Sequence, residues 1–476
     1  MNRRHFVKSS ALATAGVLLS GYAIAAGGNS SAFPTVRIPT DKRKFTSKSV
    51  EKVIAEVKKN IGNKELAWMF ENCFPNTLDT TVDYTNTDGK PDTYVITGDI
   101  DAMWLRDSSA QVWPYLPLCK DDKDLQQLIK GVICRQTKCI LKDPYANAFY
   151  KDATKISEWH NDQTKMQAGI HERKWEIDSL CYPIRLAYGY WQETGDNSFM
   201  DTDWQEAMKL IVQTFKTQQR FHDKGPYSFM RSSPYATDSI PMGGYGYPVK
   251  PNGLICSMFR PSDDATVYPY LIPSNIFALA SLHQMVEMIK TVDSVYDITP
   301  ANELMGQINE GLNLAAITKT DKKLSVYAYE SNGFGSYNLM DDANVPSLLS
   351  LPYLVGADSK ILDKATYLNT RKMVLSEDNP FFFKGSAGEG VGGPHVGMDM
   401  IWPISIIMRG LTSNDDKEIK LCLDTLQHTH AGTGFMHESF NKDDASKYSR
   451  PWFAWANTLF GEFIWKVYRE RPQLLD

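Results

Sequence analysis

The chain has 476 residues, of which 42% are hydrophobic and 22% charged, so it can bury an ample core as one large domain or two medium ones. This composition excludes a disordered chain, and a formal net charge of -5 argues against a polyanionic partner such as nucleic acid. Aromatic residues make up 12% of the sequence, which suits a carbohydrate site but also suits a large core.

Residues 1–25 have the pattern of a bacterial export signal. Arg3 and Arg4 stand before a mild apolar run at 11–19, and the Ala-Ile-Ala sequence at 23–25 fits a small-residue cleavage site. The arginine pair resembles the twin-arginine signal, which carries folded proteins across the inner membrane. A transmembrane anchor is the alternative, but the run is too short and glycine-broken to span a bilayer. We therefore expect a periplasmic protein without a stable membrane anchor.

Helical periodicity dominates the rest of the chain, after a linker at 26–47. The segments predicted as helices are 47–59, 63–72, 108–118, 125–141, 178–194, 203–219, 275–292, 299–317, 344–354, 367–375, 400–409, 417–429 and 452–469. About a dozen helices joined by polar, aromatic loops are typical of an all-α (α/α)6 barrel, in which inner and outer helices alternate. No charge run or low-complexity segment divides the chain, so we predict a single domain over 48–476. An irregular α-helical domain is the alternative.

The seven cysteines show no framework spacing, and a core of this size does not need disulfide bonds. We expect mostly buried thiols, with one bridge as the alternative. The sequence contains no CxxC pair, no HExxH motif and no His/Cys cluster at metal spacing. We therefore predict neither a metal site nor a cofactor.

The stretch at 97–112 combines a glycine, acids that include Asp99, a tryptophan and an arginine. A β-like run ends before it and an apolar helix starts within it, so Trp104, Arg106 and Asp107 are expected where the loop enters the helix. Arginine donors, aspartate acceptors and a flat indole together suit the hydroxyls and the C–H face of a sugar. The alternative is an Arg-Asp pair that caps a helix beside a core tryptophan.

A second cluster places Asp263 and Asp264 side by side in the proline-rich loop at 260–265. If this loop closes over a ligand, the two carboxyl groups cannot both be comfortably ionised, so one would have a raised pKa and could donate a proton. The alternative is that these aspartates only bond backbone amides in the turn. In the Ile-Pro-Ser-Asn segment that follows, Ser274 or Asn275 is expected to cap the next helix.

A third cluster lies near the C-terminus, where Glu438 stands in an apolar, aromatic run. This setting suits a carboxylate held out of bulk water for general-base work, whereas a solvent-facing glutamate is the alternative. The glycine-rich loop at 392–397 carries His395 and precedes Trp402, and its backbone can approach a ligand closely. Asp178 opens a further helix, where its alternative role is that of an N-cap.

On these residues the chain resembles glycoside hydrolase family 125, whose members are bacterial exo-acting α-1,6-mannosidases with an (α/α)6 barrel and an inverting mechanism. The likeness extends from about residue 48 to 468. It rests on four ordered motifs, which are Gly-Asp-Ile-Asp-Ala-Met-Trp-Leu-Arg-Asp-Ser at 98–108, Arg-Pro-Ser-Asp-Asp-Ala at 260–265, Ile-Pro-Ser-Asn at 272–275 and His-Glu-Ser-Phe at 437–440. The Trp-Leu-Arg-Asp-Ser element is also similar to an Arg-Asp sugar-holding pair found more broadly among (α/α)6 hydrolases.

The resemblance implies that an aspartate of the second motif is the general acid and that Glu438 is the general base. Asp263 is preferred, because the first acid of such a pair often donates the proton in the wider superfamily, and Asp264 is the alternative. The acid would protonate the glycosidic oxygen while Glu438 activates a water on the opposite face of the ring, giving β-mannose in one step. The residues assigned to substrate binding are Asp99, Trp104, Arg106, Asp107, Asp178, His395 and Trp402.

The implied partner is an α-mannoside oligosaccharide, such as an N-glycan or mannan fragment, and no cofactor is required. Two other interpretations are a non-catalytic glycan-binding protein and an inverting barrel glycosidase with a different sugar specificity. The presence of both acids argues against the first. A helical polysaccharide lyase would need a uronate substrate and a basic cleft, whereas this chain is acidic.

Overall fold

The computed structural model describes residues 33–292 and 296–476. The predicted signal peptide at 1–25 lies outside the described residues. Among the helices that are described, none is long and apolar enough to cross a membrane.

One compact unit covers Arg37–Asp476, so it begins ahead of the predicted boundary at residue 48. Arg37 accounts for this difference, because its guanidinium donates to the carboxylates of both Glu51 and Asp79 at distances down to 2.5 and 2.6 Å. The end of the segment predicted as a linker is thus bonded to the domain.

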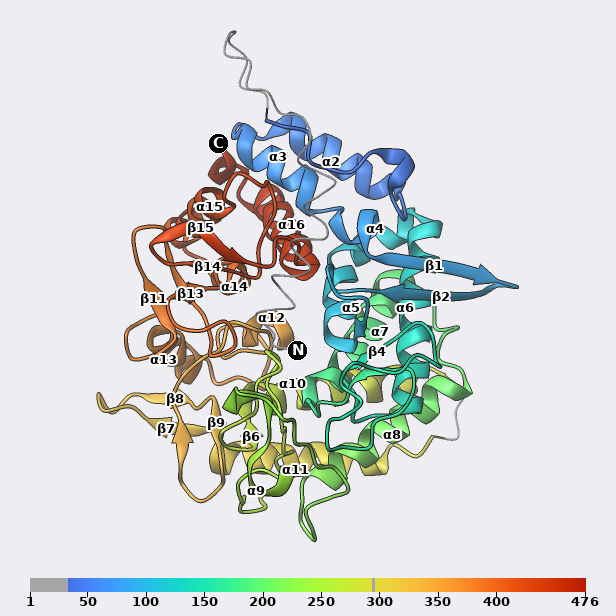
Figure 1. Ribbon diagram of the computed structural model, residues 1–476, viewed down its shortest axis with the longest axis vertical. Coiled ribbons are helices and arrows are strands. Elements are labelled where there is room, and N and C mark those ends of the chain that lie inside the picture. The colour runs from blue at the N-terminus through green and yellow to red at the C-terminus, as the bar shows by residue number, and fades with distance from the viewer. Residues whose placement is uncertain (1–32, 293–295) are drawn as a thin grey trace. The chain divides into compact units, whose positions relative to one another are not determined.

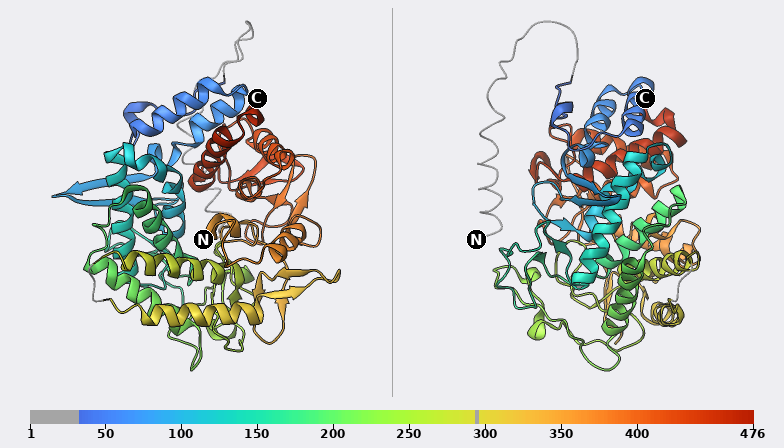
Figure 2. Two further views of the ribbon diagram at one scale, coloured as in Figure 1. Left: turned by 180° about the vertical axis from the view of Figure 1, so that it is seen from behind. Right: turned by 90° about the vertical axis from the view of Figure 1, so that its right-hand side faces the viewer.

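The helices of this unit form two concentric layers (Figures 1 and 2). The inner layer consists of α5 (Leu105–Val112), α7 (Ile177–Thr194), α10 (Ile272–Ile289), α12 (Leu351–Val355), α14 (Pro403–Leu411) and α16 (Ala454–Glu470). The outer layer consists of α2 (Lys48–Asn60), α3 (Lys64–Cys73), α6 (Lys123–Lys142), α8 (Thr202–Gln218), α11 (Thr299–Ala315), α13 (Lys364–Val374) and α15 (Asp416–Thr429). Helix α7 packs against α5 and α10, α10 packs against α12, and α16 packs against α14 and α5, so the last inner helix contacts the first. The predicted (α/α)6 barrel is confirmed.

The two layers differ in their residues as a barrel requires. Helix α10 is buried along most of its length and is largely apolar, and every residue of α5 is buried although most of its side chains are polar. Outer helices bury a single face, as α2 does with Val50, Ile54 and Val57 at helical spacing. Side-chain caps start most of the outer helices; for example, Ser47 accepts from the Val50 amide and Asp122 accepts from the Leu125 amide, whereas α11 has no such cap.

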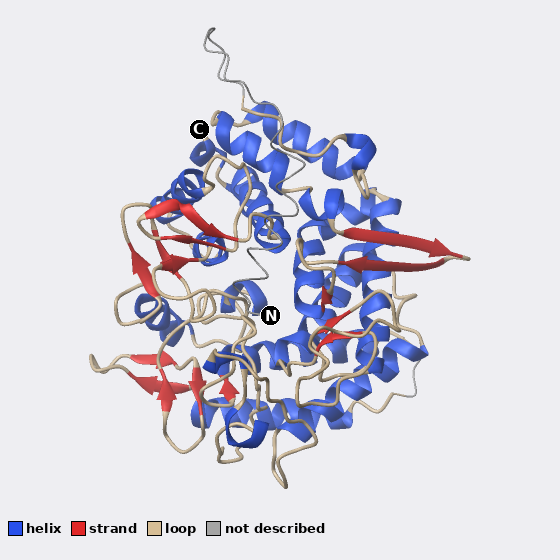
Figure 3. Ribbon diagram, in the orientation of Figure 1, coloured by secondary structure: helices blue, strands red, loops and turns tan. Residues whose placement is uncertain are grey.

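Short antiparallel strands and turns connect the helices (Figure 3). The strands are β1 (Val82–Thr87) with β2 (Lys90–Val95), β3 (Met103–Trp104) with β4 (Ala148–Phe149) and β5 (Ile170–Glu172), β6 (Tyr270–Leu271) with β9 (Glu330–Ser331) and β10 (Tyr337–Asn338), β7 (Ile317–Lys319) with β8 (Ser325–Tyr327), β11 (Phe382–Lys384) with β12 (Glu389–Val391), and β13 (Met400–Ile401) with β14 (Ser439–Asn441) and β15 (Asp444–Ser449). The remaining short helices are α4 (Asn76–Thr80), α9 (Pro241–Gly244), η1 (Thr40–Lys42), η2 (Trp113–Asp121), η3 (Ala236–Asp238) and η4 (Pro472–Leu475). Strands β3, β6 and β13 each lead directly into an inner helix, so they fix the starts of α5, α10 and α14.

The predicted cap at Ser274 or Asn275 is wrong, and the alternative role of Asp178 as an N-cap is excluded, because both inner helices begin earlier than their sequences suggest. Helix α10 starts at Ile272, and the Asn275 side chain instead accepts from the Ile255 amide at 2.8 Å and donates to its carbonyl at 3.0 Å. Asp178 is not an N-cap either, since α7 starts at Ile177 and Glu176 precedes it without a side-chain cap. The seven cysteines are all free thiols.

Candidate active site

The first turns of several inner helices meet at one end of the ring. Arg106 in the first turn of α5 donates to Asp178 in the first turn of α7. Trp402, which precedes α14, packs edge to face on Phe453, which precedes α16. The three sequence clusters therefore converge, although hundreds of residues separate them along the chain.

Arg106 lies at the centre of a buried group of acids. Its guanidinium is 3% exposed, and Nη1 donates to Glu176 at 2.6 Å and to Asp178 at 3.1 Å. Nη2 reaches Asp263 at 3.4 Å, and Nε lies 3.5 Å from an oxygen of Asp107. The predicted Arg106–Asp107 pair is therefore one contact of four, and the shortest is with Glu176.

The acids around Arg106 differ in how readily they ionise. Burial, offset in part by Arg106, raises the pKa of Asp107 to about 6. Glu176 is fully buried, so desolvation raises its pKa well above the ordinary value, and the charge of Asp263 adds to the effect. Glu176 is therefore biased towards its protonated form.

Asp263 is the acid of this group that faces open space. Its side chain is 21% exposed, whereas those of Glu176 and Asp178 are 0% exposed. The backbone has a left-handed φ of 65°, and the Asp263 carbonyl accepts from the buried Lys174 ammonium at 2.8 Å. Burial disfavours the charged carboxylate, but Lys174 and Arg106 outweigh it, so the pKa of Asp263 is lowered.

Asp264 lies behind this surface and is fully buried. One carboxylate oxygen is 3.3 Å from His395 Nδ1, so it ties the 260–265 loop to the glycine-rich loop. The other oxygen is buried without a partner among the described residues. Of the two neighbouring aspartates, Asp263 is thus the one whose carboxyl group is open to a ligand.

Glu438 ends the loop before β14 and is held by two neighbours. One carboxylate oxygen accepts from the Ser449 hydroxyl at 2.8 Å, and the other is 3.5 Å from Nη1 of Arg450. The side chain is 9% exposed, which leaves part of it open. The apolar setting expected from the sequence is therefore accompanied by a cation, and Arg450 keeps the carboxylate oriented.

Asp99 supports this arrangement from the opposite end of the sequence. Its carboxylate accepts from Arg450 Nε at 3.0 Å and also from Nη2. The neighbouring Gly98 has a φ of +128°, and a Cβ there would meet the Trp452 carbonyl oxygen at 2.7 Å. The glycine therefore lets the 97–99 loop lie against the segment that carries Arg450.

The aromatic residues predicted to bind substrate are mostly enclosed. Trp104 is 6% exposed and packs edge to face on His171, with ring centroids 5.1 Å apart. Trp402 is 3% exposed and lies 6.2 Å from the His395 ring between centroids. The Trp402 indole N–H is buried without a partner among the described residues, so it can donate to a ligand.

Two residues of this site received no role in the sequence analysis. Glu176 shares Arg106 with Asp178, and Arg450 joins Glu438 to Asp99. Both stand beside residues that the sequence analysis selected, but local sequence gives no sign of their partners. Among the described residues, no group of three or more His, Cys, Asp or Glu is arranged to hold a metal ion.

Three comparisons with known proteins agree with this geometry. A family model described as metal-independent alpha-mannosidase, glycoside hydrolase family 125, matches residues 63–465. The chain is 42% identical over 460 residues to the Meiotically up-regulated gene 157 protein of Schizosaccharomyces pombe, covering 93% of this chain and 90% of that protein. It is 40% identical to a metal-independent alpha mannosidase of Streptococcus pneumoniae, whose structure is a non-productive substrate complex with alpha-1,6-mannobiose. That match has a TM-score of 0.85 and covers 90% of this chain and 100% of the other.

The closed double ring of helices, with its buried acids at one end, defines an (α/α)6-barrel glycoside hydrolase. The family match covers most of the described chain. The chain belongs to glycoside hydrolase family 125, the metal-independent α-mannosidases. The family and the fold expected from the sequence motifs are both confirmed.

Proposed function

We propose that the protein is an exo-acting, inverting α-1,6-mannosidase that releases terminal mannose from α-mannosides. One observation carries the proposal: Asp263 and Glu438 have side chains that are 21% and 9% exposed and each lies beside an arginine, while Glu176, Asp178 and Asp264 are fully buried. The α-1,6-mannobiose bound by the Streptococcus pneumoniae relative supports the choice of linkage.

In this proposal Asp263 is the general acid, and Glu176 keeps it supplied with a proton. The pKa of Asp263 is lowered, so without a second proton source Asp263 would be a poor acid catalyst. The pKa of Glu176 is raised well above its ordinary value by burial, and both Glu176 and Asp263 contact the Arg106 guanidinium. The two carboxyl groups thus titrate as a pair, and the shared proton moves to Asp263 as the glycosidic oxygen develops charge.

Glu438 is the general base of the same step. It accepts a proton from a water that attacks the anomeric carbon from the opposite face, so the bond to the leaving sugar breaks as the new bond forms. Arg450 and Ser449 hold the carboxylate in place for this transfer. Arg106 and Asp107 contribute donors and acceptors for the hydroxyls of the terminal mannose.

Proton NMR of the first product tests the mechanism. An inverting enzyme releases β-mannose from α-1,6-mannobiose, and α-mannose appears later by mutarotation. Glu438→Gln should abolish hydrolysis without accumulating a mannosyl-enzyme detectable by mass spectrometry. The appearance of α-mannose first would overturn the inverting mechanism. Activity on another mannobiose isomer or on a hexuronate polymer in place of the α-1,6 isomer would overturn the substrate assignment.

We further propose that the protein is exported to the periplasm by the twin-arginine route. The arginine pair, the short apolar run and the small-residue site within 1–25 support this proposal. The composition and net charge of the chain favour a neutral glycan over nucleic acid as its partner.

A further inference from the structure

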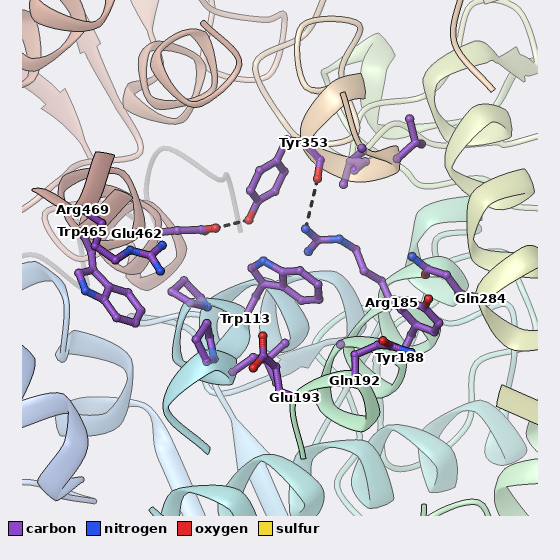
Figure 4. Close-up of a pocket in the computed structure, with 17 residues that line it drawn as sticks. Trp113, Arg185, Tyr188, Gln192, Glu193, Gln284, Tyr353, Glu462, Trp465 and Arg469 are labelled. Atoms are coloured by element: carbon purple, nitrogen blue, oxygen red, sulfur yellow. Dashed lines mark hydrogen bonds between the residues drawn. The ribbon is translucent and has the colours of Figure 1, made fainter. Parts of the chain in front are cut away.

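A cavity of about 390 Å³ lies where the inner helices end (Figure 4). Its lining comes from η2 after α5, from the later turns of α7 and α16, and from α10 and α12. Glu462, which lines it, follows the start of α16 by eight residues, which is about 12 Å along a helix. The cavity is therefore separate from the catalytic end, and its volume is in the range of small-ligand sites.

Arg185 is the notable cation of this cavity. It is 4% exposed, and its guanidinium stacks over Trp113 at 3.4 Å and over Tyr353 at 4.8 Å from the ring centroids. Its hydrogen bond to the protein is a long one, 3.5 Å from Nη2 to the Tyr353 carbonyl. In the described part of the chain, Arg185 forms no ion pair with a carboxylate within 4.0 Å. None of the Arg185 nitrogens is sealed in the protein without a partner, so its remaining donors are open to the cavity, where a ligand can accept from them.

Acceptors face the same space. The Glu462 carboxylate accepts from the Tyr353 hydroxyl at 2.9 Å and retains further acceptor capacity. The Gln284 side-chain oxygen is buried without a partner in the described residues. Figure 4 shows the Arg185 and Glu462 side chains approaching Tyr353 from opposite sides. Gln284 lies on the side of Arg185 and Arg469 lies on the side of Glu462 (Figure 4), so a ligand placed here would meet donors and acceptors on both sides.

The charges of the lining select against an ion. Arg185 and Arg469 are balanced by Glu193 and Glu462, so the lining carries no net charge. An anion would meet Glu462, and a purely apolar ligand would leave the donors of Arg185 unused. A sugar hydroxyl both accepts and donates, and its C–H groups can pack on the aromatic side chains of the wall.

We propose that this cavity is a second binding site, distinct from the catalytic site, for a neutral mono- or disaccharide. In it, Arg185 donates to the hydroxyls of the sugar, Glu462 and Gln284 accept from them, and Trp113 and Tyr353 hold the arginine in position. Gly189 makes room for this stack, because a Cβ there would meet the Trp113 ring at 2.7 Å.

Fluorine NMR of the full chain labelled with 5-fluorotryptophan tests the proposal, with mannose as the probe. Trp113 reports on the cavity and Trp402 reports on the catalytic end, and each signal is assigned by a Trp→Phe variant. Both signals should shift, with separate apparent dissociation constants. Arg185→Met should weaken the Trp113 titration at least about tenfold, because charge-assisted bonds are lost, and leave the Trp402 titration within about twofold.

A second variant, at the protein surface, tests the same cavity in case Arg185→Met fails to fold. Gln192 is exposed and lines the cavity, so Gln192→Tyr should narrow it and weaken the Trp113 titration without disturbing the core. Gln213→Tyr, at an exposed position of α8 outside the cavity, is the matched control and should leave both titrations unchanged. The proposal is overturned if Trp402 saturates with mannose while Trp113 does not move. It is equally overturned if phosphate shifts the Trp113 signal and mannose does not.

Discussion

Arg106 is the residue on which the ionisation of the catalytic cluster depends, because four acids lie around it. Arg106→Ala leaves Glu176 and Asp178 buried without their cation, so kcat/KM should fall at least about 100-fold, equivalent to roughly 3 kcal/mol. Arg371→Ala is a matched control, because Arg371 pairs with Glu418 on the outer layer. That control should lower thermal stability but not kcat/KM. Near-normal turnover of Arg106→Ala would make the cluster purely structural.

The two neighbouring aspartates differ in what their loss should do. Asp263→Asn should be nearly inactive on α-mannosides but should recover on an activated aryl or fluoride donor, whose leaving group needs little protonation. Asp264 is buried against His395, so Asp264→Asn should disturb the loop and show no such recovery. Steady-state kinetics on both donor types measure the contrast. Recovery in Asp264→Asn instead would exchange the two roles.

Asp107 gives the folded protein a pH dependence of defined sign. Its pKa rises from 3.8 to about 6 on folding, so between these values the folded state binds a proton that the unfolded chain has released. The stability contributed by this group is therefore complete below pH 3.8 and is lost as the pH rises through about 6. Against Asp107→Asn, the wild type should lose up to about 3 kcal/mol of unfolding free energy between pH 4 and 7. Urea unfolding at both pH values measures this, and parallel curves for the two proteins would contradict it.

At the scale of the elements, outer helices could be predicted closely and inner ones less so. The predicted 203–219 and observed Thr202–Gln218 of α8 agree, because one apolar face and an aspartate cap are local signals. Helices α5 and α10 start earlier than predicted, because Trp104 and Leu271 precede them without a side-chain cap. Their starts are set by short strand pairs with distant segments, which local periodicity does not encode.

The candidate site could also be predicted only in part. Acids and aromatic residues that stand in unusual local runs were found from the sequence, among them Asp263 and Glu438. The roles of Glu176 and Arg450 could not be found, because they arise from pairing with Arg106 and Asp99 across 70 and 351 positions. The sequence shows which residue types are present, whereas the packing of the helix ring determines which of these side chains are in contact.

The packing of the 97–99 loop on the segment before α16 can be tested with one methyl group. Gly98→Ala would place a Cβ 2.7 Å from the Trp452 carbonyl oxygen and push Arg450 away from Glu438, so both kcat/KM and stability should fall. Gly89→Ala in the β1–β2 turn is the matched control, since its φ is +77° but nothing lies within 4 Å. It should cost about 1 kcal/mol of backbone strain and leave activity unchanged. Equal activity of both variants would show that the contact is not needed for catalysis.

At the scale of the whole molecule, export can be tested through the arginine pair. Arg3→Lys combined with Arg4→Lys should trap the precursor in the cytoplasm, whereas the wild type should appear in the periplasm at the mass expected for cleavage after Ala25. Cell fractionation and mass spectrometry provide the measurement, and Lys8→Arg serves as a charge-conserving control. Unchanged export of the double variant would reject the twin-arginine route.

Because the last helix completes the ring, the fold cannot be completed before this helix has been synthesised. Helix α16 packs on α3 and α5, and the Asn63 amide donates to the Leu475 carbonyl at 2.9 Å. Glu438 and Arg450 also belong to the last segments to be synthesised. A nascent chain still on the ribosome has not placed α16 against α3 and α5 and has not placed Glu438, the proposed general base. Under the proposed mechanism, hydrolysis therefore begins only after translation ends, and activity arrives together with complete folding, as the proposed export of an already folded protein requires.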